Sequence, residues 1–375
     1  MQPLKILALM SQTGNGHVSA AKALQEAFHT LYPGEVNVKI IEVFNSKNPN
    51  ILDKITKLYE PTILNAPKLW GLAFRLTNSQ TAIRSMAKAA KPTIGKRLQK
   101  IINKEKPDAI ISVHPLANHI TLDSLKSLNL SIPFFTCLTD LVDVHAGWVT
   151  KNNLIFAPTE KAKKGLLEQG VLKSNINILG LPIQNKFSMD FQNQNLVRKK
   201  LKLDPNLFCA FMVGGGAGAG ELLEKANTIS NAKLNLQLIV ACGRNQDLKE
   251  KFEKECFNMP VKILGFADNV HELIYASNVV ISKAGSLTTA ESLSLGKPII
   301  LINVLPGQED GNPILLKKVG AGIRVKTSTE LVKNLQNLLN NPGKLEKMSK
   351  AAFRLGRPNA SKEIAQKIYS ILRYN

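Results

Sequence analysis

Short apolar runs, each followed by a polar or glycine-rich turn, recur through the first half of the chain. They cover residues 4–10, 36–43, 109–113, 133–138, 153–157 and 176–179. Runs of this length predict strands that are buried on both faces, and the longer stretches between them predict helices. Strands that alternate with helices predict a parallel sheet covered by helices on both sides.

The same pattern starts again in the second half. The predicted strands there cover residues 207–213, 236–241, 261–264, 279–281 and 298–304. We expect the segment from Leu181 to about Pro205 to link the two halves. A final helix, at about residues 360–373, is expected to cross back to the first half.

With a length of 375 residues, these patterns predict an α/β protein of two doubly wound Rossmann-like domains facing a cleft. We expect an N-terminal domain over residues 1–185 and a C-terminal domain over residues 186–345. Residues 346–375 are expected to form a C-terminal helix that packs back on the N-terminal domain.

Glycine-rich loops follow predicted strands in both halves. The first loop contains Gly14, Asn15 and Gly16, and the second half contains Gly214–Gly216 and a loop over residues 283–288. Such a loop lets backbone N–H groups approach a phosphate, and the N-terminus of the following helix favours an anion. We therefore expect phosphate binding in both halves, with a simple tight turn as the alternative interpretation of Gly214–Gly216.

Three titratable residues of the first half, His17, His114 and Asp140, come just after predicted strands. Because the carboxyl ends of parallel strands share one edge of a sheet, these side chains are expected to gather there. His17 is the leading candidate for a general base, since histidine titrates near neutrality; its alternative role is a hydrogen bond to a phosphate or headgroup. Asp140 is the alternative base, or it orients His17 or His145. His114 is either another residue of the cleft or a strand-end cap.

Five segments in a fixed order carry a family resemblance. They are Thr-Gly-Asn-Gly-His at 13–17, Thr-Asp-Leu at 139–141 with His145 and Trp148, Leu-Gly-Leu-Pro-Ile at 179–183, Lys-Ala-Gly at 283–285 and Pro-Gly-Gln-Glu-Asp-Gly-Asn at 306–312. In these segments the chain resembles the monogalactosyldiacylglycerol synthase and processive diacylglycerol glucosyltransferase family, relatives of the lipid I N-acetylglucosaminyltransferase. The chain departs from the family at Asn15, where glycine is usual, and at Ser286, where proline is common.

The resemblance implies a GT-B type glycosyltransferase fold whose second half binds a UDP-sugar. It implies that residues 283–288 neighbour the donor diphosphate, that Glu291 binds the ribose, and that Gly265 and Phe266 face the uracil. It also implies that the loop at 306–312 binds the hexose hydroxyls. The residues assigned to the donor are Gly214, Gly215, Gly216, Arg244, Gly265, Phe266, Lys283, Gly285, Ser286, Leu287, Thr288, Glu291, Gln308, Glu309 and Asn312.

Each donor assignment has a simpler alternative. Glu291 could be an acid on a helix surface, Arg244 could form a surface ion pair instead of contacting phosphate or base, and the loop at 306–312 could be an ordinary polar turn. The density of polar groups in that loop favours sugar binding, because amides and carboxylates supply directional hydrogen bonds.

The net charge of +21 indicates a surface that attracts polyanions. Basic residues are concentrated between Ile51 and Lys106, where bulky apolar residues that include Trp70 and Phe74 lie among them. This mixture is typical of an element that lies in a membrane interface containing anionic lipid; the alternative is a domain core with solvated lysines. Acceptor or membrane contact is assigned to Gly14, Asn15, Gly16, His145, Trp148, Trp70 and Phe74.

Other features of the sequence limit the class of protein to which the chain can belong. No apolar stretch is long enough for a transmembrane helix, and no secretory signal is evident. The four cysteines, Cys137, Cys209, Cys242 and Cys256, lack metal-ligand spacing, so we expect reduced thiols and neither a metal nor another cofactor. With 6% aromatic residues and no recognised nucleic-acid-binding motif, nucleic acid is not an expected partner.

The sequence therefore predicts an inverting transferase that moves a hexose, galactose or glucose, from a UDP-sugar to diacylglycerol or a related lipid. It is expected to be cytoplasmic and attached to the inner face of an anionic membrane. Transfer of N-acetylglucosamine to a polyprenyl-linked acceptor is the first alternative, and a UDP-sugar epimerase is a weaker one. A non-catalytic protein that binds nucleotide, lipid or nucleic acid is an alternative of another class.

Overall fold

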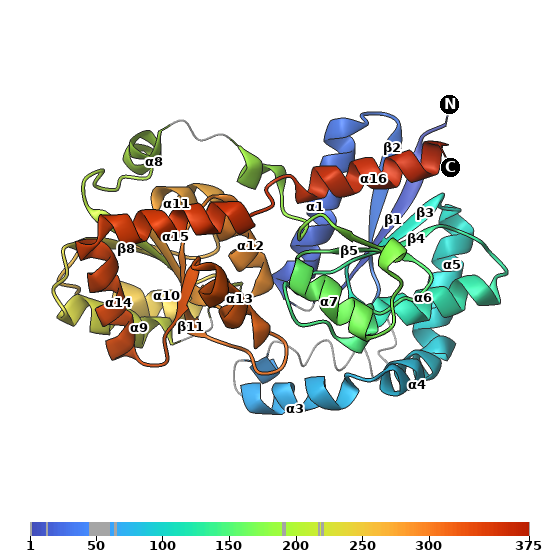
Figure 1. Cartoon of the computed structure of the whole chain (residues 1–375), viewed down its shortest axis with the longest axis horizontal. Coiled ribbons are helices and arrows are strands. Elements are labelled where there is room, and N and C mark those ends of the chain that lie inside the picture. Colours follow the sequence, from blue (N-terminus) through green and yellow to red (C-terminus); the bar gives the residue numbers. More distant parts are fainter. Residues whose placement is uncertain are drawn as a thin grey trace. The chain divides into compact units, whose positions relative to one another are not determined.

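The computed structural model describes residues 2–12, 14–44, 61–63, 66–189, 193–216, 218 and 221–374. These residues form two compact units, each built on a six-stranded parallel sheet with helices on its faces (Figure 1). The first unit comprises residues 1–185, 306–308 and 359–375, and the second comprises residues 186–305 and 309–358. Thr13, residues 51–60 of the basic region and Gly220 lie outside the described residues.

The sheet of the first unit has the strand order β2-β1-β3-β4-β5-β6. Its strands are β1 (Leu4–Met10), β2 (Val36–Glu42), β3 (Ala109–Ser112), β4 (Phe134–Cys137), β5 (Leu154–Ala157) and β6 (Ile176–Ile178). β1, β3 and β4 are neighbours near the middle, so the segments that follow them emerge side by side at one edge. All three strands are apolar because helices cover both faces of the sheet.

Helices pack on both faces of this first sheet. They are α1 (Asn15–Leu31), α4 (Gln80–Ala90), α5 (Lys96–Glu105), α6 (Pro115–Ser127), α7 (Glu160–Glu168) and α16 (Ala360–Tyr374). A further helix of this unit, α3 (Pro67–Thr77), contacts α4. The C-terminal helix α16 runs beside α1 (Figure 1), where Tyr369 stacks on Tyr32 with ring centroids 3.7 Å apart. The apolar face of α16, with Ile364 and Ile368 fully buried, thereby completes the core of the first unit.

The prolines of the basic region mark helix boundaries. Pro67 occupies the first turn of α3, where its missing N–H has no helical partner to lose. Pro92 lies in a π-helical turn over Lys91–Gly95 that joins α4 to α5, since proline cannot continue the regular hydrogen-bond ladder. The described part of the basic region is therefore helical.

The sheet of the second unit has the strand order β12-β11-β10-β7-β8-β9. Its strands are β7 (Phe208–Val213), β8 (Leu236–Ala241), β9 (Val261–Leu264), β10 (Val279–Lys283), β11 (Ile299–Asn303) and β12 (Gly322–Arg324). Its helices are α8 (Gln194–Lys200), α9 (Leu222–Asn231), α10 (Gln246–Glu253), α11 (Val270–Ala276), α12 (Ser286–Ser294), α13 (Gly311–Val319), α14 (Ser328–Asn340) and α15 (Pro342–Leu355). The loops after β7, β8 and β10 carry the glycine-rich segments of this unit.

Each strand predicted from the apolar runs is present, with its ends within two residues of the prediction. The three-residue strand β12 was not predicted, because so short a run carries no recognisable pattern. α15 belongs to the second unit, so the segment that returns to the first unit begins at Asn359.

Candidate active site

Two histidines meet at the carboxyl edge of the first sheet. His17 lies in the first turn of α1, just after β1, and His114 follows β3. Their ring centroids are 4.5 Å apart in an edge-to-face arrangement, and the ring of Phe44 lies 5.1 Å from that of His114. Strand order therefore brings together residues that are almost a hundred positions apart, as the sequence predicted for this edge.

His17 is held by two hydrogen bonds to one ring nitrogen. Its Nδ1 lies 2.7 Å from the carbonyl oxygen of Val113 and 3.0 Å from Oγ1 of Thr139. Because a carbonyl oxygen can only accept, Nδ1 carries the proton, and Nε2 of the neutral ring keeps its lone pair. Burial lowers the pKa of His17 to about 4, although the bond to Val113 partly opposes this effect. The ring is therefore neutral near pH 7.

His114 is a buried neighbour of His17. It occupies the N-cap position of α6 and is 4% exposed. Burial, with a smaller contribution from His17, holds the pKa of His114 well below its usual value. His114 thus forms part of the wall against which the ring of His17 packs, and its place at the start of α6 agrees with the strand-end alternative.

Asp140 is buried just after β4, and both its carboxylate oxygens accept hydrogen bonds. Nε1 of Trp148 donates to Oδ2 at 2.6 Å, and Nε2 of Gln308 donates to Oδ1 at 3.2 Å. Trp148 is fully buried, so the prediction that it touches a membrane is wrong: an indole without exposed surface cannot reach lipid. Its observed role is to hold Asp140.

His145 fastens helix α3 to the loop that follows β4. Its Nδ1 accepts a hydrogen bond from the N–H of Gly147 at 3.2 Å, and Nε2 lies 3.3 Å from Oγ1 of Thr77. The ring also packs on Phe74, with centroids 4.7 Å apart. Burial lowers the pKa of His145 to about 4, so this histidine is neutral and its contacts are those of a structural residue.

The apolar residues of α3 divide between two faces. Trp70 and Phe74 are half-buried and point inward, where Trp70 Nε1 donates to Gln308 Oε1 at 3.3 Å. The opposite face exposes Leu69 by 60%, Leu72 by 55% and Leu76 by 70%. The exposed apolar surface of this helix therefore consists of these leucines, and not of the two aromatic residues to which the sequence assigned membrane contact.

Both departures from the family pattern fall at helix starts. Gly14 adopts the positive φ of the first loop, 72°, and Asn15 is already helical, so Asn15 needs no left-handed conformation. Ser286 is likewise the first residue of α12 after the N-cap Gly285. Proline is favoured at that position because its φ suits a helix start, and serine occupies it here without strain.

In the second unit, the loops after β7 and β8 interlock through glycine. Gly215 and Gly243 have φ angles of 73° and 64°. A Cβ on Gly243 would lie 2.6 Å from the carbonyl oxygen of Gly216, and the N–H of Arg244 donates to that oxygen at 2.9 Å. Only glycine fits so close an approach, so Gly215, Gly216 and Gly243 place closely packed backbone at the carboxyl edge.

The third glycine loop, residues 283–288, begins with a lysine. Lys283, the last residue of β10, forms an ion pair with Glu309 at 2.6 Å, and the other oxygen of Glu309 accepts from the N–H of Leu305 at 3.0 Å. Asn312 is fully buried and donates to the carbonyl oxygen of Ala284 at 2.6 Å. Asn312 therefore holds the loop after β10, and this buried side chain is not placed to contact a hexose.

Glu291 is a buried carboxyl group one turn into α12. It is 7% exposed, and burial raises its pKa to about 8, with Lys186 opposing the shift. The alternative of an acid on a helix surface is therefore wrong. No residue of the described ranges forms a hydrogen bond or ion pair with its side chain, so both carboxyl oxygens are available to a ligand.

Arg244 and Phe266 follow the neighbouring strands β8 and β9. The Arg244 guanidinium lies 5.4 Å from the centroid of the Phe266 ring, which is 55% exposed. Gly265, the residue before Phe266, has no side chain that could stand in front of this ring and cation. An exposed aromatic ring and a cation at a strand edge are suited to a flat heterocycle and a phosphate.

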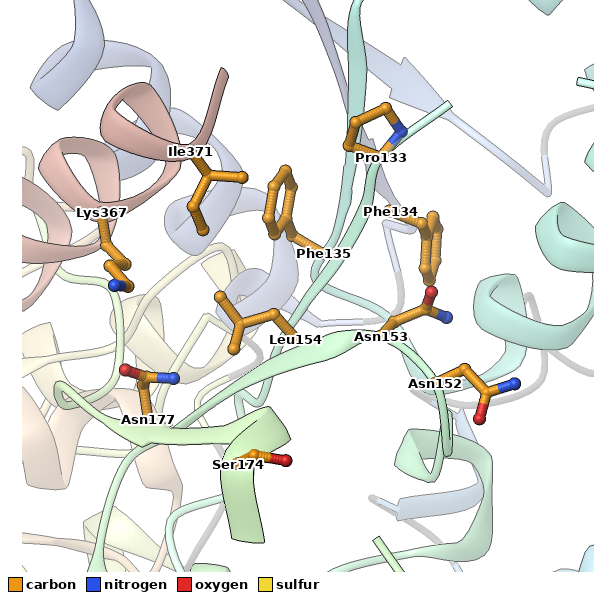
Figure 2. Close-up of a pocket in the computed structure, with 10 residues that line it drawn as sticks. All are labelled: Pro133, Phe134, Phe135, Asn152, Asn153, Leu154, Ser174, Asn177, Lys367 and Ile371. Carbon is orange, nitrogen blue, oxygen red and sulfur yellow. The ribbon is translucent and has the colours of Figure 1, made fainter. Parts of the chain in front are cut away.

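A separate cavity of about 530 Å³ lies at the opposite edge of the first sheet, at the amino ends of β4, β5 and β6 (Figure 2). Phe134, Phe135 and Leu154 line it together with Lys367 and Ile371 of α16. It contains none of the predicted site residues, and ligands of doubly wound sheets bind at the carboxyl edge. We therefore do not assign the reaction to this cavity.

Within the described ranges, no cluster of three or more His, Cys, Asp or Glu side chains could hold a metal ion. In the same ranges, no helix is long and apolar enough to cross a membrane.

Sequence reasoning missed two residues that hold His17. Val113 acts through its backbone oxygen, which no side-chain pattern can reveal. Thr139 was part of a quoted segment, and only its place after β4, next to β3, brings its hydroxyl to His17. Gly243, which shapes the donor loops, was likewise not singled out.

Comparison with known proteins agrees with this architecture. Family models match in both halves: monogalactosyldiacylglycerol (MGDG) synthase over residues 17–183 and the glycosyltransferase family 28 C-terminal domain over residues 209–367. Monogalactosyldiacylglycerol synthase 3, chloroplastic, of Arabidopsis thaliana is 32% identical over 98% of this chain and 81% of its own length. Monogalactosyldiacylglycerol synthase, chloroplastic, of Spinacia oleracea is 31% identical over 99% of this chain and 73% of its own length.

Solved structures of low sequence identity share the fold. MurG of Acinetobacter baumannii aligns over 98% of this chain and 100% of its own, with a TM-score of 0.60 and 14% identity. A UDP-GlcNAc 2-epimerase of Neisseria meningitidis, bound to UDP-GlcNAc, gives the same coverage, TM-score and identity. The fold and the relatives define the class: the protein is a UDP-sugar-dependent glycosyltransferase with the predicted GT-B type fold. Within that class, the chain belongs to the monogalactosyldiacylglycerol synthase family, which confirms the resemblance.

Proposed function

We propose that this protein transfers a hexose from a UDP-hexose to the free hydroxyl of diacylglycerol, with inversion, and so makes a β-glycosyl diacylglycerol. The observation that supports this reaction most strongly is the kinship with monogalactosyldiacylglycerol synthases along nearly the whole chain. The hexose is galactose or glucose.

In this proposal His17 is the general base. The acceptor oxygen attacks the anomeric carbon, its proton passes to His17 Nε2, and the bond to UDP breaks with its electron pair leaving on the diphosphate. The tautomer fixed by Val113 supports this role, because Nε2 is left unprotonated. Asp140 accepts hydrogen bonds from Trp148 and Gln308. We assign it the role of orienting these two side chains.

The second unit is proposed to bind the donor. Gly214–Gly216 and the first amides of α12, from Gly285 to Thr288, face the diphosphate, with Lys283 as a nearby cation. Backbone N–H groups and a helix N-terminus stabilise a leaving anion and require no metal. The ribose hydroxyls donate to Glu291, whose buried oxygens accept no hydrogen bond from described residues, and the uracil lies against Gly265 and Phe266 beside Arg244.

The hexose contacts are assigned to Gln308 and Glu309. Both are polar side chains fixed by other residues, Glu309 by Lys283 and Gln308 by Trp70. Asn312 is assigned a supporting role, because its amide holds Ala284.

The first unit is proposed to bind the acceptor at Gly14, Asn15 and Gly16 and to contact the membrane. Leu69, Leu72 and Leu76 form an exposed stripe on α3, at a spacing that places them on one helix face. No Asp or Glu occurs from Pro61 to Lys104, so the charged side chains of this stretch are all cations. An apolar stripe flanked by cations suits the interface of an anionic membrane, here assigned to the cytoplasmic face.

A matrix of donors and acceptors tests the reaction. Radiolabelled UDP-galactose, UDP-glucose and UDP-N-acetylglucosamine are each incubated with vesicles that contain diacylglycerol or a polyprenyl-linked acceptor. We expect a labelled glycolipid only with diacylglycerol and a UDP-hexose. Product with UDP-N-acetylglucosamine and the polyprenyl acceptor would replace the proposal with the first alternative, and no lipid product would overturn it.

A further inference from the structure

The inner face of α3 is locked to the short segment Pro306–Gln308, which belongs to the same compact unit. Two glycines make the contact possible. A Cβ on Gly71 would lie 2.7 Å from Cβ of Pro306, and a Cβ on Gly307 would lie 3.0 Å from the Phe74 ring. Gly307 also has a φ of 82°. The helix and the segment therefore approach more closely than side chains would allow.

This close approach places the indole of Trp70 on the carboxamide of Gln308. Trp70 Nε1 donates to Oε1 of Gln308 at 3.3 Å, and Nε2 of Gln308 donates to Oδ1 of Asp140 at 3.2 Å. Because an indole N–H can only donate and a carboxylate oxygen can only accept, the two partners allow one orientation of the amide. Gln308 keeps one acceptor lone pair and one N–H hydrogen for a ligand, each in a fixed direction.

We propose that Trp70 and Gly71 are positioning residues that fix the amide of Gln308, and through it the recognition of the donor hexose. This inference rests on the proposed function, in which Gln308 contacts the hexose. A sugar hydroxyl is discriminated by a donor and an acceptor of known direction, and an amide free to flip presents both patterns. Trp70 thus serves the sugar site from the inner face of a helix whose leucines face outward.

The test separates recognition of the hexose from recognition of the nucleotide. Affinities for UDP and for UDP-hexose are measured by calorimetry for the wild type and for Trp70→Phe, which removes the N–H donor and keeps an aromatic ring at this position. We expect the affinity for UDP to stay the same and that for UDP-hexose to fall by about threefold to tenfold, as loss of one hydrogen bond implies. Gly71→Ala should act in the same direction, because the added methyl group pushes α3 away from Pro306.

Two controls make the result decisive. Ala73→Ser alters an exposed position of the same helix and should leave both affinities unchanged. Combined with Gln308→Leu, Trp70→Phe should add nothing further, because both changes remove the same amide contact. Equal losses for UDP and UDP-hexose, additive losses in the double variant, or no loss in Trp70→Phe would overturn the inference. A wild-type protein that binds neither ligand would instead overturn the proposed function.

Discussion

The hydrogen bonds of His17 decide which of its ring nitrogens accepts a proton. Histidine after a glycine loop was identifiable from the sequence, because the loop follows an apolar run that ends at Met10. Its tautomer was not predictable, since it depends on the backbone oxygen of Val113 and the hydroxyl of Thr139. Its lowered pKa was also invisible, because that shift comes from burial in the folded chain.

The pKa of about 4 for His17 predicts how the reaction depends on pH. A base that is already unprotonated keeps kcat nearly constant as the pH falls from 8 to 6, whereas an ordinary histidine would lose activity there. Transfer rates with a short-chain diacylglycerol at saturating donor concentration measure this profile, because the titration of Glu291 then changes donor affinity without changing the rate. An acid limb centred near pH 6.5 would contradict the assignment of a half-buried, neutral His17 as the base.

Glu291 predicts a release of protons on donor binding. Its pKa of about 8 means that the carboxyl group is mostly protonated at pH 7, and hydrogen bonds from ribose hydroxyls favour the carboxylate. Binding of UDP-hexose should therefore release a substantial fraction of one proton, measured by calorimetry in two buffers of different ionisation enthalpy. Glu291→Gln should abolish the release; the same release in this variant would exclude Glu291 as its source.

At the scale of elements, helix α3 shows where sequence patterns become ambiguous. One face of the helix carries residues 69, 72 and 76, and another carries residues 70, 74 and 77. Apolar side chains occur on both faces. The sequence could predict that the basic region contains amphipathic helices, but not which apolar face is buried. Contacts with His145 and Pro306 settle the question, and they involve residues far along the chain.

The outer face of α3 predicts a binding defect. Replacing Leu69, Leu72 and Leu76 by serine should lower the affinity for anionic vesicles by at least roughly tenfold, because apolar area no longer enters the interface. Vesicle sedimentation measures this affinity. Serine at three other exposed leucines, Leu130, Leu167 and Leu172, is the matched control. Equal binding by the two triple variants would refute the assignment of α3 to the membrane.

At the scale of the whole molecule, the architecture was the most predictable property. Buried parallel strands must be continuous apolar runs, so their positions could be predicted from the sequence, and two sheets of this kind define the fold. Interlocking of glycine loops, as between Gly243 and Gly216, could not be predicted. Such contacts depend on the spatial order of strands, which chain order alone does not give.

Buried neutral histidines predict that the folded protein loses stability in acid. The pKa values of His17, His114 and His145 are lowered on folding, so the unfolded chain takes up protons first as the pH falls below about 6.5. For His145, with a pKa of about 4, the loss between pH 7 and pH 5 is about 2 kcal/mol. Urea unfolding of the wild type and of His145→Gln at the two pH values measures it as the difference between their pH dependences, because the raised pKa of Glu291 changes the total stability in the opposite direction. An equal pH dependence in the two proteins would contradict the prediction.

The central claim is inverting transfer of a hexose to diacylglycerol with His17 as the base. The most direct measurement is the anomeric configuration, by NMR, of the lipid product that the wild type and His17→Ala make from an α-linked UDP-hexose and diacylglycerol vesicles. We predict a β-linked glycolipid from the wild type, and a rate at least about a hundredfold lower for His17→Ala with donor affinity preserved. An α-linked product, or undiminished turnover in His17→Ala, would contradict this account.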